Sequence, residues 1–70
     1  WWPLPYYLGV GYSRTGRYDE AVAMLKEALK GDPSGAEIMA ELVIAYNALG
    51  DEVNAEKYKK KMDLVRNSAE

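Results

Sequence analysis

The side chains that could do chemistry in this chain are few, and the two most versatile types are missing. The chain has no His and no Cys, which removes the commonest general base, the commonest metal ligand and any thiolate. Serine hydroxyls remain as possible nucleophiles, but no imidazole is present to activate them. The serines are Ser13, Ser34 and Ser68. We therefore predict no catalytic residues and expect that the chain is not an enzyme.

Carboxylates and glycines offer two further kinds of site, and both have simpler explanations. The pairs Asp19-Glu20 and Asp51-Glu52 fall where helices are expected to begin, and negative charge there complements the helix dipole. Their spacing does not favour a metal site. Gly9-Val10-Gly11 lacks the third glycine and the preceding strand of a phosphate-binding loop. We expect no cofactor and no metal.

Length and charge exclude other classes of protein. The chain has 70 residues, enough for one small domain. Its net charge of -2 argues against a nucleic-acid partner, and no apolar run approaches the roughly 20 residues of a membrane span. No secretion signal is visible, which favours the cytoplasm over other compartments. Because the chain begins at Trp1 without Met, we expect a fragment or a processed product.

Glycine and proline divide the first half of the chain into two helical segments. Proline is tolerated only in the first turn of a helix, so the first helix must begin near Leu4 or Pro5. Gly16 can end that helix in the left-handed conformation. A second helix is expected over about residues 19–30, followed by the helix-breaking run Gly31-Asp32-Pro33.

Two more helices are expected in the second half. Ser34 and Glu37 have the spacing of a capping box, so a third helix should begin there and run to about Leu49. Asp51 is a good N-cap for a fourth helix that reaches about Arg66. Apolar residues recur at helical spacing, and no stretch alternates with period two. The sequence therefore predicts an all-α fold of four helices. Examples of the spacing are Val22, Leu25 and Leu29 in the second helix and Ile38, Leu42, Ala45, Tyr46 and Leu49 in the third.

The two halves of the chain match each other when one is shifted by 34 residues. The matching residues are Leu8 and Leu42, Tyr12 and Tyr46, Gly16 and Gly50, and Ala21 and Ala55. A helix–turn–helix unit of this length resembles the tetratricopeptide repeat. In the first unit the resemblance is carried by Leu8-Gly9-Val10-Gly11-Tyr12, Gly16-Arg17-Tyr18-Asp19-Glu20-Ala21, Leu25, Ala28 and Asp32-Pro33, and in the second by Leu42-Val43-Ile44-Ala45-Tyr46, Leu49-Gly50-Asp51 and Ala55.

The resemblance implies one superhelical domain over residues 1–70, built from two antiparallel helical hairpins. Repeat one covers about residues 2–35, and repeat two covers about residues 36–69. Small side chains are expected to let the paired helices approach each other closely, and two glycines should supply the tight turns. The small residues are Gly9, Gly11, Ala21 and Ala28, and the turn glycines are Gly16 and Gly50.

One face of the second helix differs between the repeats. In a solenoid this face packs on the next unit, and here an apolar stripe in repeat one becomes a charged stripe in repeat two. We predict that the first stripe is covered and that the second faces water, as in a C-terminal cap. The run Lys59-Lys60-Lys61 is then a solvated helix face. The apolar stripe is Val22, Leu25 and Leu29, and the charged stripe is Glu56, Lys59 and Asp63.

Tetratricopeptide arrays present the first helices of their repeats on a concave surface that binds peptides, so the resemblance implies a protein or peptide partner. Some family members hold a C-terminal carboxylate there with Lys and Asn. The corresponding positions of this chain hold Tyr6, Val10, Ala40 and Ile44, so no carboxylate clamp is expected. The implied groove is lined by Tyr6, Val10, Ser13 and Arg14 from repeat one and by Ala40, Ile44, Asn47 and Ala48 from repeat two.

The N-terminal segment suggests an alternative function. It carries more aromatic and aliphatic residues than one hairpin needs, and exposed apolar patches usually mark a contact. The patch consists of Trp1, Trp2, Leu4 and Tyr7. Without a disulfide or metal, two repeats gain stability from additional repeats or from self-association. The chain could thus be a structural scaffold unit that forms a homodimer through this face, or the C-terminal end of a longer array.

Overall fold

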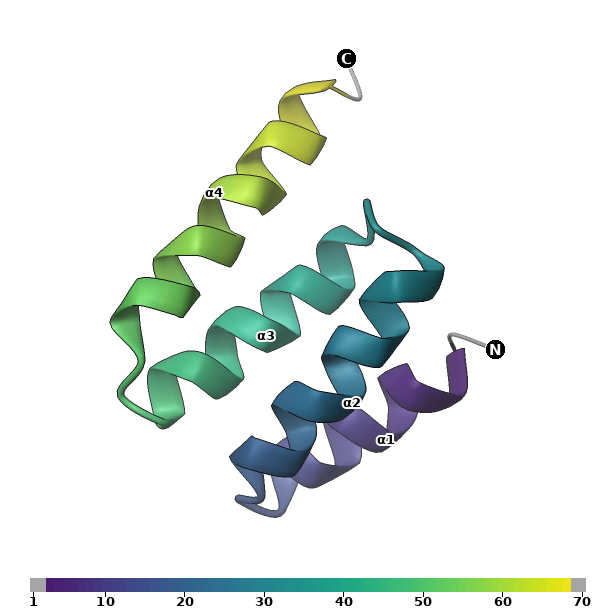
Figure 1. Ribbon diagram of the computed structural model, residues 1–70, viewed down its shortest axis with the longest axis vertical. Coiled ribbons are helices and arrows are strands. Elements are labelled where there is room, and N and C mark those ends of the chain that lie inside the picture. Colours follow the sequence, from purple (N-terminus) through teal and green to yellow (C-terminus); the bar gives the residue numbers. More distant parts are fainter. Residues whose placement is uncertain (1–2, 69–70) are drawn as a thin grey trace.

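The structure, a computed structural model, describes residues 3–68 and contains four α-helices in that range. The helices are α1 (Pro3–Arg14), α2 (Tyr18–Gly31), α3 (Ala36–Ala48) and α4 (Glu52–Ser68). No strand occurs within these residues. Figure 1 shows α3 between α2 and α4, with α1 behind α2. The prediction of an all-α fold with four helices is confirmed.

The helices form two hairpins whose turns are built in the same way. Gly16 and Gly50 adopt φ angles of 81° and 77°, which favour glycine because no Cβ is present. After each glycine the chain turns back onto the preceding helix. The Arg17 N–H donates to the Tyr12 carbonyl over 2.8 Å, and the Asp51 N–H donates to the Tyr46 carbonyl over 2.9 Å. The two repeats therefore share their turn geometry, as the sequence match predicts.

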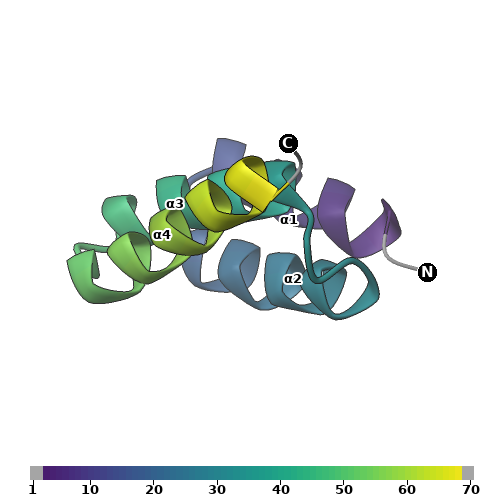
Figure 2. The same ribbon diagram turned by 90° about the horizontal axis from the view of Figure 1, so that it is seen from above.

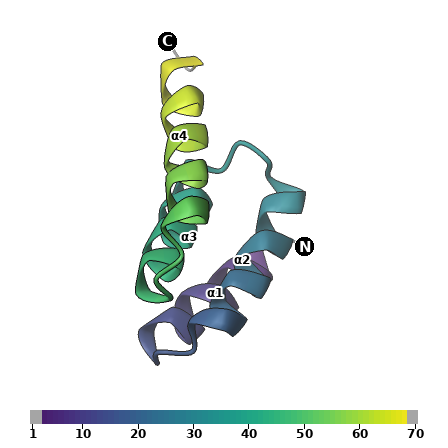
Figure 3. The same cartoon turned by 60° about the vertical axis from the view of Figure 1, so that its left-hand side comes forward.

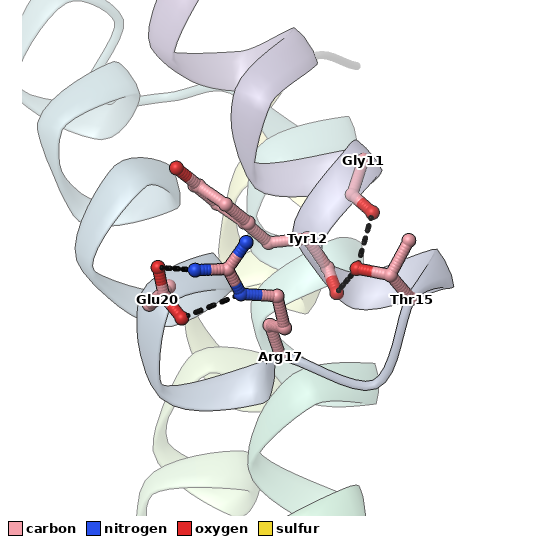
Figure 4. Close-up of polar contacts among 5 residues, drawn as sticks. All are labelled: Gly11, Tyr12, Thr15, Arg17 and Glu20. Atoms are coloured by element: carbon pink, nitrogen blue, oxygen red, sulfur yellow. Dashed lines mark hydrogen bonds and ion pairs between the residues drawn. The ribbon is translucent and has the colours of Figure 1, made fainter.

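The side chain of Arg17 reinforces the first of these turns. Its guanidinium lies 4.8 Å from the centre of the Tyr12 ring and donates two hydrogen bonds of 2.7 Å to Glu20. The Thr15 hydroxyl donates to the carbonyl of Tyr12 over 3.0 Å, and Figure 4 shows these contacts together. Exposed ion pairs contribute little stability, so Arg17 mainly fixes the geometry with which α2 leaves the turn.

In the second hairpin, the start of α4 follows the prediction and the start of α3 departs from it. Asp51 caps α4: its two carboxylate oxygens accept from the backbone and side-chain nitrogens of Asn54 at 3.2 and 2.7 Å. The capping box predicted from Ser34 and Glu37 is wrong. The cap of α3 is Gly35, with no side-chain cap bond. The Gly35 N–H bonds to the Asp32 carbonyl over 3.0 Å, which shifts the cap by one residue and breaks the capping-box spacing.

The core lies where α3 packs against α2. Figure 2 separates α1 from α2, which overlap in Figure 1, and Figure 3 shows the second hairpin set at an angle to the first. Besides its hairpin partner α4, the helix α3 packs on α2 and touches α1 only lightly. One hydrophobic cluster therefore joins both repeats. It consists of Leu25, Ala28, Ile38, Met39, Leu42, Tyr46, Ala55 and Tyr58.

Small residues set the separation within the first hairpin. Gly9, Ala21 and Ala28 are buried, and a Cβ atom on Gly9 would stand 2.6 Å from Leu25 Cγ. Gly11 was also expected to allow a close approach, and that expectation is wrong. It is exposed, and a Cβ there would meet nothing within 4 Å. Two residues along a helix point to nearly opposite sides, so Gly11 faces away from the contact that Gly9 makes.

The difference predicted between the stripes of α2 and α4 is present. Leu25 is fully buried, and Val22 and Leu29 pack half-buried against the core. The counterparts on α4 are all exposed, as are the three lysines of the run at residues 59–61. The apolar stripe of α2 thus holds the two repeats together, whereas the corresponding stripe of α4 is charged and exposed. The exposed stripe residues of α4 are Glu56, Lys59 and Asp63.

Candidate partner-binding groove

A groove with a volume of about 700 Å³ lies between α3 and α4. Both helices supply apolar side chains to it. Ile44 is 53% exposed and Val53 is 80% exposed, although burial of such side chains is favourable. The apolar lining residues are Ala40, Val43, Ile44, Val53, Ala55 and Met62, and the polar ones are Asn47, Glu52, Glu56 and Lys59. The second hairpin therefore presents an open apolar surface with a charged border.

The charges of the groove come from α4. Glu52 and Glu56 are one helical turn apart, and Lys59 follows three residues later. Residues at such spacings share one side of a helix. The border is thus negative where α4 begins and positive near its middle. An amphipathic partner would match it best with a basic side chain beside the start of α4.

Three residues of the predicted groove lie at this place. Ala40, Ile44 and Asn47 line it, and their spacing of four and three residues puts them on one face of α3. Ala48 is exposed beyond the lining residues. That these α3 residues bind a partner stays a prediction.

The predicted residues of α1 do not join them. Tyr6 lines a separate hollow of about 410 Å³ beside the α2–α3 loop, where burial, and then the negative charges of Glu41 and Glu37, raise its pKa. Val10 and Ser13 are half-buried and Arg14 is exposed. None of these three lines the groove between α3 and α4 or the hollow beside Tyr6. Binding by the α1 residues remains a prediction.

The α4 side of the groove was missed, although the sequence carries a signal for it. Val53 and Met62 line the groove and are two of the apolar residues that stand among the charged residues of α4. Their counterparts in repeat one, 34 residues earlier, are Asp19 and Ala28. Because α4 was treated only as a polar cap, Val53 and Met62 were not interpreted as part of a binding surface.

A third hollow, of about 430 Å³, lies on another side of the molecule and is bordered by Lys26, Lys30 and Lys61. The rings of Tyr46 and Tyr58 stack beside it, with centroids 5.7 Å apart and planes 10° from parallel. A side-chain hydrogen bond with Tyr46 raises the pKa of Lys26. Two of these lysines lie over the tyrosine pair: Lys26 Nζ is 5.9 Å from the centre of the Tyr46 ring, and Lys61 Nζ is 5.2 Å from that of Tyr58.

The predicted N-terminal patch is described only in part. Leu4 is 65% exposed and Tyr7 is 70% exposed, and the Tyr7 ring meets that of Tyr6 edge-on at 5.5 Å. Trp1 and Trp2 lie outside the described residues. Self-association through this patch therefore stays a prediction.

Two features are absent from the described residues. No group of three or more acidic side chains that could hold a metal ion occurs among residues 3–68. None of the four helices there is long and apolar enough to cross a membrane. In chemical terms the groove between α3 and α4 supplies apolar area, one amide and three charges.

Comparison with known proteins identifies the repeat. A family model for the tetratricopeptide repeat matches residues 14–62, from the end of α1 into α4, which is more than half of the chain. Comparisons with curated proteins and with solved structures each gave no match. The family generally provides protein–protein interaction modules, and the matched residues include both hairpin turns and the groove. On its sequence match and its paired helical hairpins, the chain belongs to the tetratricopeptide repeat family.

Proposed function

We propose that this chain is a non-catalytic binding module, and that its groove between α3 and α4 takes the apolar face of a helix or peptide from a partner protein. The observation that carries the proposal is internal to the chain. The corresponding surface of the first hairpin already holds a helix, because α3 packs there on Leu25 and Ala28. A surface built by the same repeat in the second hairpin suits the same kind of occupant.

The exposed side chains support this choice of occupant. Covering Ile44 and Val53, now 53% and 80% exposed, would remove apolar area from water at roughly 25 cal/mol per Å². The groove offers few hydrogen-bonding groups to an extended chain, since its lining holds one amide, of Asn47, besides the charged side chains. A helix satisfies its own backbone groups and presents apolar residues every three or four positions.

The test is selection of amphipathic helices displayed as a library on phage, followed by measurement of each selected peptide against single variants. Ile44→Glu and Val53→Glu place a carboxylate in the groove, so each should weaken binding by about tenfold or more. The matched control is Leu64→Glu, which makes the same kind of change at an exposed leucine of α4 outside the groove. Circular dichroism verifies that all three variants remain folded.

Two results would contradict the proposal. Selected peptides that bind Ile44→Glu and Val53→Glu as tightly as they bind the unmodified chain must use another surface. Failure to select any helical peptide, in a screen that succeeds with a tetratricopeptide control of known specificity, would argue that the groove is not a binding site.

A further inference from the structure

Corresponding residues of α1 and α3 differ sharply in exposure. On α3, Ile38, Leu42 and Ala45 are 1%, 0% and 0% exposed. Their counterparts, 34 residues earlier on α1, are exposed: Leu4 at 65%, Leu8 at 44%, and Gly11. Both helices have a hairpin partner, so the hairpin contact cannot explain the difference. These three positions mark the face that α3 lays onto the first hairpin and that α1 leaves uncovered.

The receiving surface shows the reverse difference. On the first hairpin Gly9, which packs on Leu25, is buried and Val10 is half-buried, whereas their counterparts Val43 and Ile44 are half-buried and exposed. Those two counterparts line the groove between α3 and α4. At one end of the molecule, α1 thus exposes the face that α3 uses for docking. At the other end, the groove between α3 and α4 is a receiving surface that holds no helix.

We propose that the occupant of the groove is α1 of a second copy of this chain, docked as α3 docks on the first hairpin. This inference rests on the proposed function, because it names the partner of the same groove. The contact is heterologous: the two copies use different surfaces, and the bound pair still offers one free α1 face and one free groove. Association therefore continues head to tail beyond the dimer.

The charges of the two surfaces agree with this arrangement. The end of α3 lies beside the start of α2, as Figure 1 shows. In the same arrangement, the end of the docked α1 lies beside the start of the receiving α4. The end of α1 carries Arg14, its only charged side chain, and the start of α4 carries Glu52 and Glu56 on the groove. A basic end of the docking helix thus meets an acidic end of the groove.

Three substitutions weaken the contact relative to the packing inside the chain, because Val22, Leu25 and Leu29 on α2 correspond to Glu56, Lys59 and Asp63 on α4. The position of the fully buried Leu25 is taken in the groove by Lys59. A lysine can lay its aliphatic stem over apolar surface while its ammonium group reaches water. It still contributes less apolar area than leucine, so association between copies should be weaker than the covalently linked docking of α3 and should grow with protein concentration.

The same contact accounts for most of the conspicuous apolar exposure. It would cover Leu4 and Leu8 on one copy and Ile44 and Val53 on the other, all at least 44% exposed in the single chain. A symmetric dimer through the α1 face would cover only the first two and leave the groove open. The geometry of the repeats therefore favours the heterologous contact over the symmetric one.

The experiment uses two variants that each remove one of the two surfaces. Leu8→Glu places a carboxylate on the docking face, and Ile44→Glu places one in the groove; both positions are exposed in the single chain, so folding should be retained and is verified by circular dichroism. Sedimentation velocity is measured for each chain over a wide concentration range. The unmodified chain should exceed the mass of a dimer, and each variant alone should remain monomeric.

The decisive sample is an equal mixture of the two variants. The Ile44→Glu chain keeps its α1 face and the Leu8→Glu chain keeps its groove, so the mixture should form a dimer of one copy each and nothing larger. A symmetric contact through α1 would be lost in Leu8→Glu, retained in Ile44→Glu and not restored by mixing, and that pattern would overturn the proposal. An unmodified chain that stays monomeric throughout the range would overturn it as well.

A second pair of variants tests the charge contact independently. Arg14→Glu should raise the dissociation constant by about tenfold, and mixing it with the double variant Glu52→Lys and Glu56→Lys should recover much of the loss. No recovery would show that Arg14 does not meet these carboxylates.

If the chains do not associate but selected helical peptides still lose affinity for Ile44→Glu, the head-to-tail inference fails alone. If both tests fail, the groove itself is not a binding site.

Discussion

Gly9 and Leu25 lie so close together that a Cβ atom on Gly9 would stand 2.6 Å from Leu25 Cγ and 2.8 Å from Leu25 Cδ2. Leu25 cannot move aside easily, because it is fully buried and belongs to the cluster on which α3 packs. The same Cβ would also lie 3.3 Å from the carbonyl oxygen of Ala21. The separation of α1 from α2 therefore depends on the absence of a side chain at Gly9.

Gly9→Ala should destabilise the fold. Overpacking a core contact lowers the free energy of unfolding by about 1–3 kcal/mol, and replacing a helical glycine with alanine raises it by about 1 kcal/mol. We expect a net loss of about 1 kcal/mol in the free energy of unfolding, measured by urea denaturation.

Gly11→Ala is the control, since it lies on the same helix two residues away. A Cβ there meets nothing within 4 Å, so the substitution should stabilise the chain by about 0.5–1 kcal/mol. If both alanine variants are stabilised equally, the close contact between Gly9 and Leu25 does not form in solution.

The sequence predicts the local elements of this fold well, because single residues determine them. Gly16 and Gly50 end their helices with φ angles of 81° and 77°, and Asp51 caps α4. Each of these features depends on a residue type whose conformational preference is strong. The cap of α3 was mispredicted because a turn from Asp32 to Gly35, rather than the capping-box spacing, decides where that helix begins.

The candidate groove could be predicted only in part, because it depends on how the helices meet. Periodicity and the family resemblance placed Ala40, Ile44 and Asn47 on one face of α3, where the structure has them. They could not show that Tyr6 lies in a different hollow, because that follows from the angle between the hairpins. Gly11 was misjudged for the same reason: which side of α1 meets α2 is a property of the packed pair.

The cap of α4 should make stability depend on pH. Hydrogen bonds from the Asn54 side chain, and then from its backbone, lower the pKa of Asp51 below its ordinary value of 3.8. A lowered carboxyl pKa stabilises the fold fully above the unfolded-state value, and this contribution is lost as the pH falls through the folded-state pKa. Asp51→Asn keeps an N-cap acceptor but cannot titrate. The stability advantage of the unmodified chain over Asp51→Asn should therefore shrink as the pH falls below 3.8.

Urea denaturation of both chains between about pH 2 and pH 6 measures this effect. The other carboxylates titrate alike in both chains, so their contribution cancels in the difference. A difference in stability that stays constant across this range would show that the Asp51 carboxylate is not preferentially stabilised in the folded chain.

The stacked pair Tyr46 and Tyr58 should be important for the second hairpin, because it joins α3 to α4 inside the core. Tyr58 is 7% exposed, and removing a buried aromatic ring costs about 3–5 kcal/mol. That is comparable with the whole stability expected of so small a domain, at roughly 0.05–0.15 kcal/mol per residue. Tyr58→Ala should therefore lose cooperative thermal unfolding, as followed by circular dichroism.

Repeat one supplies the control for this position, since the counterpart of Tyr58 is Met24. Tyr58→Met keeps a large apolar side chain that adapts to irregular space, so it should retain a cooperative transition at a lower midpoint. A Tyr58→Ala chain that unfolds like the Tyr58→Met chain would show that the ring stack contributes little.

The groove should not act as a clamp for a C-terminal carboxylate. The positions that would need Lys and Asn hold Tyr6, Val10, Ala40 and Ile44, and the groove itself is bordered by the carboxylates of Glu52 and Glu56. An acidic peptide tail would thus meet like charges, with Lys59 as the one cation among the lining residues. An acidic peptide with a free C-terminus should show no saturable binding in the micromolar range by isothermal titration calorimetry.

The control is the same peptide with an amidated C-terminus, which should be equally inactive. Micromolar binding that disappears on amidation would require a cationic site for the terminal carboxylate, and the prediction would then be wrong.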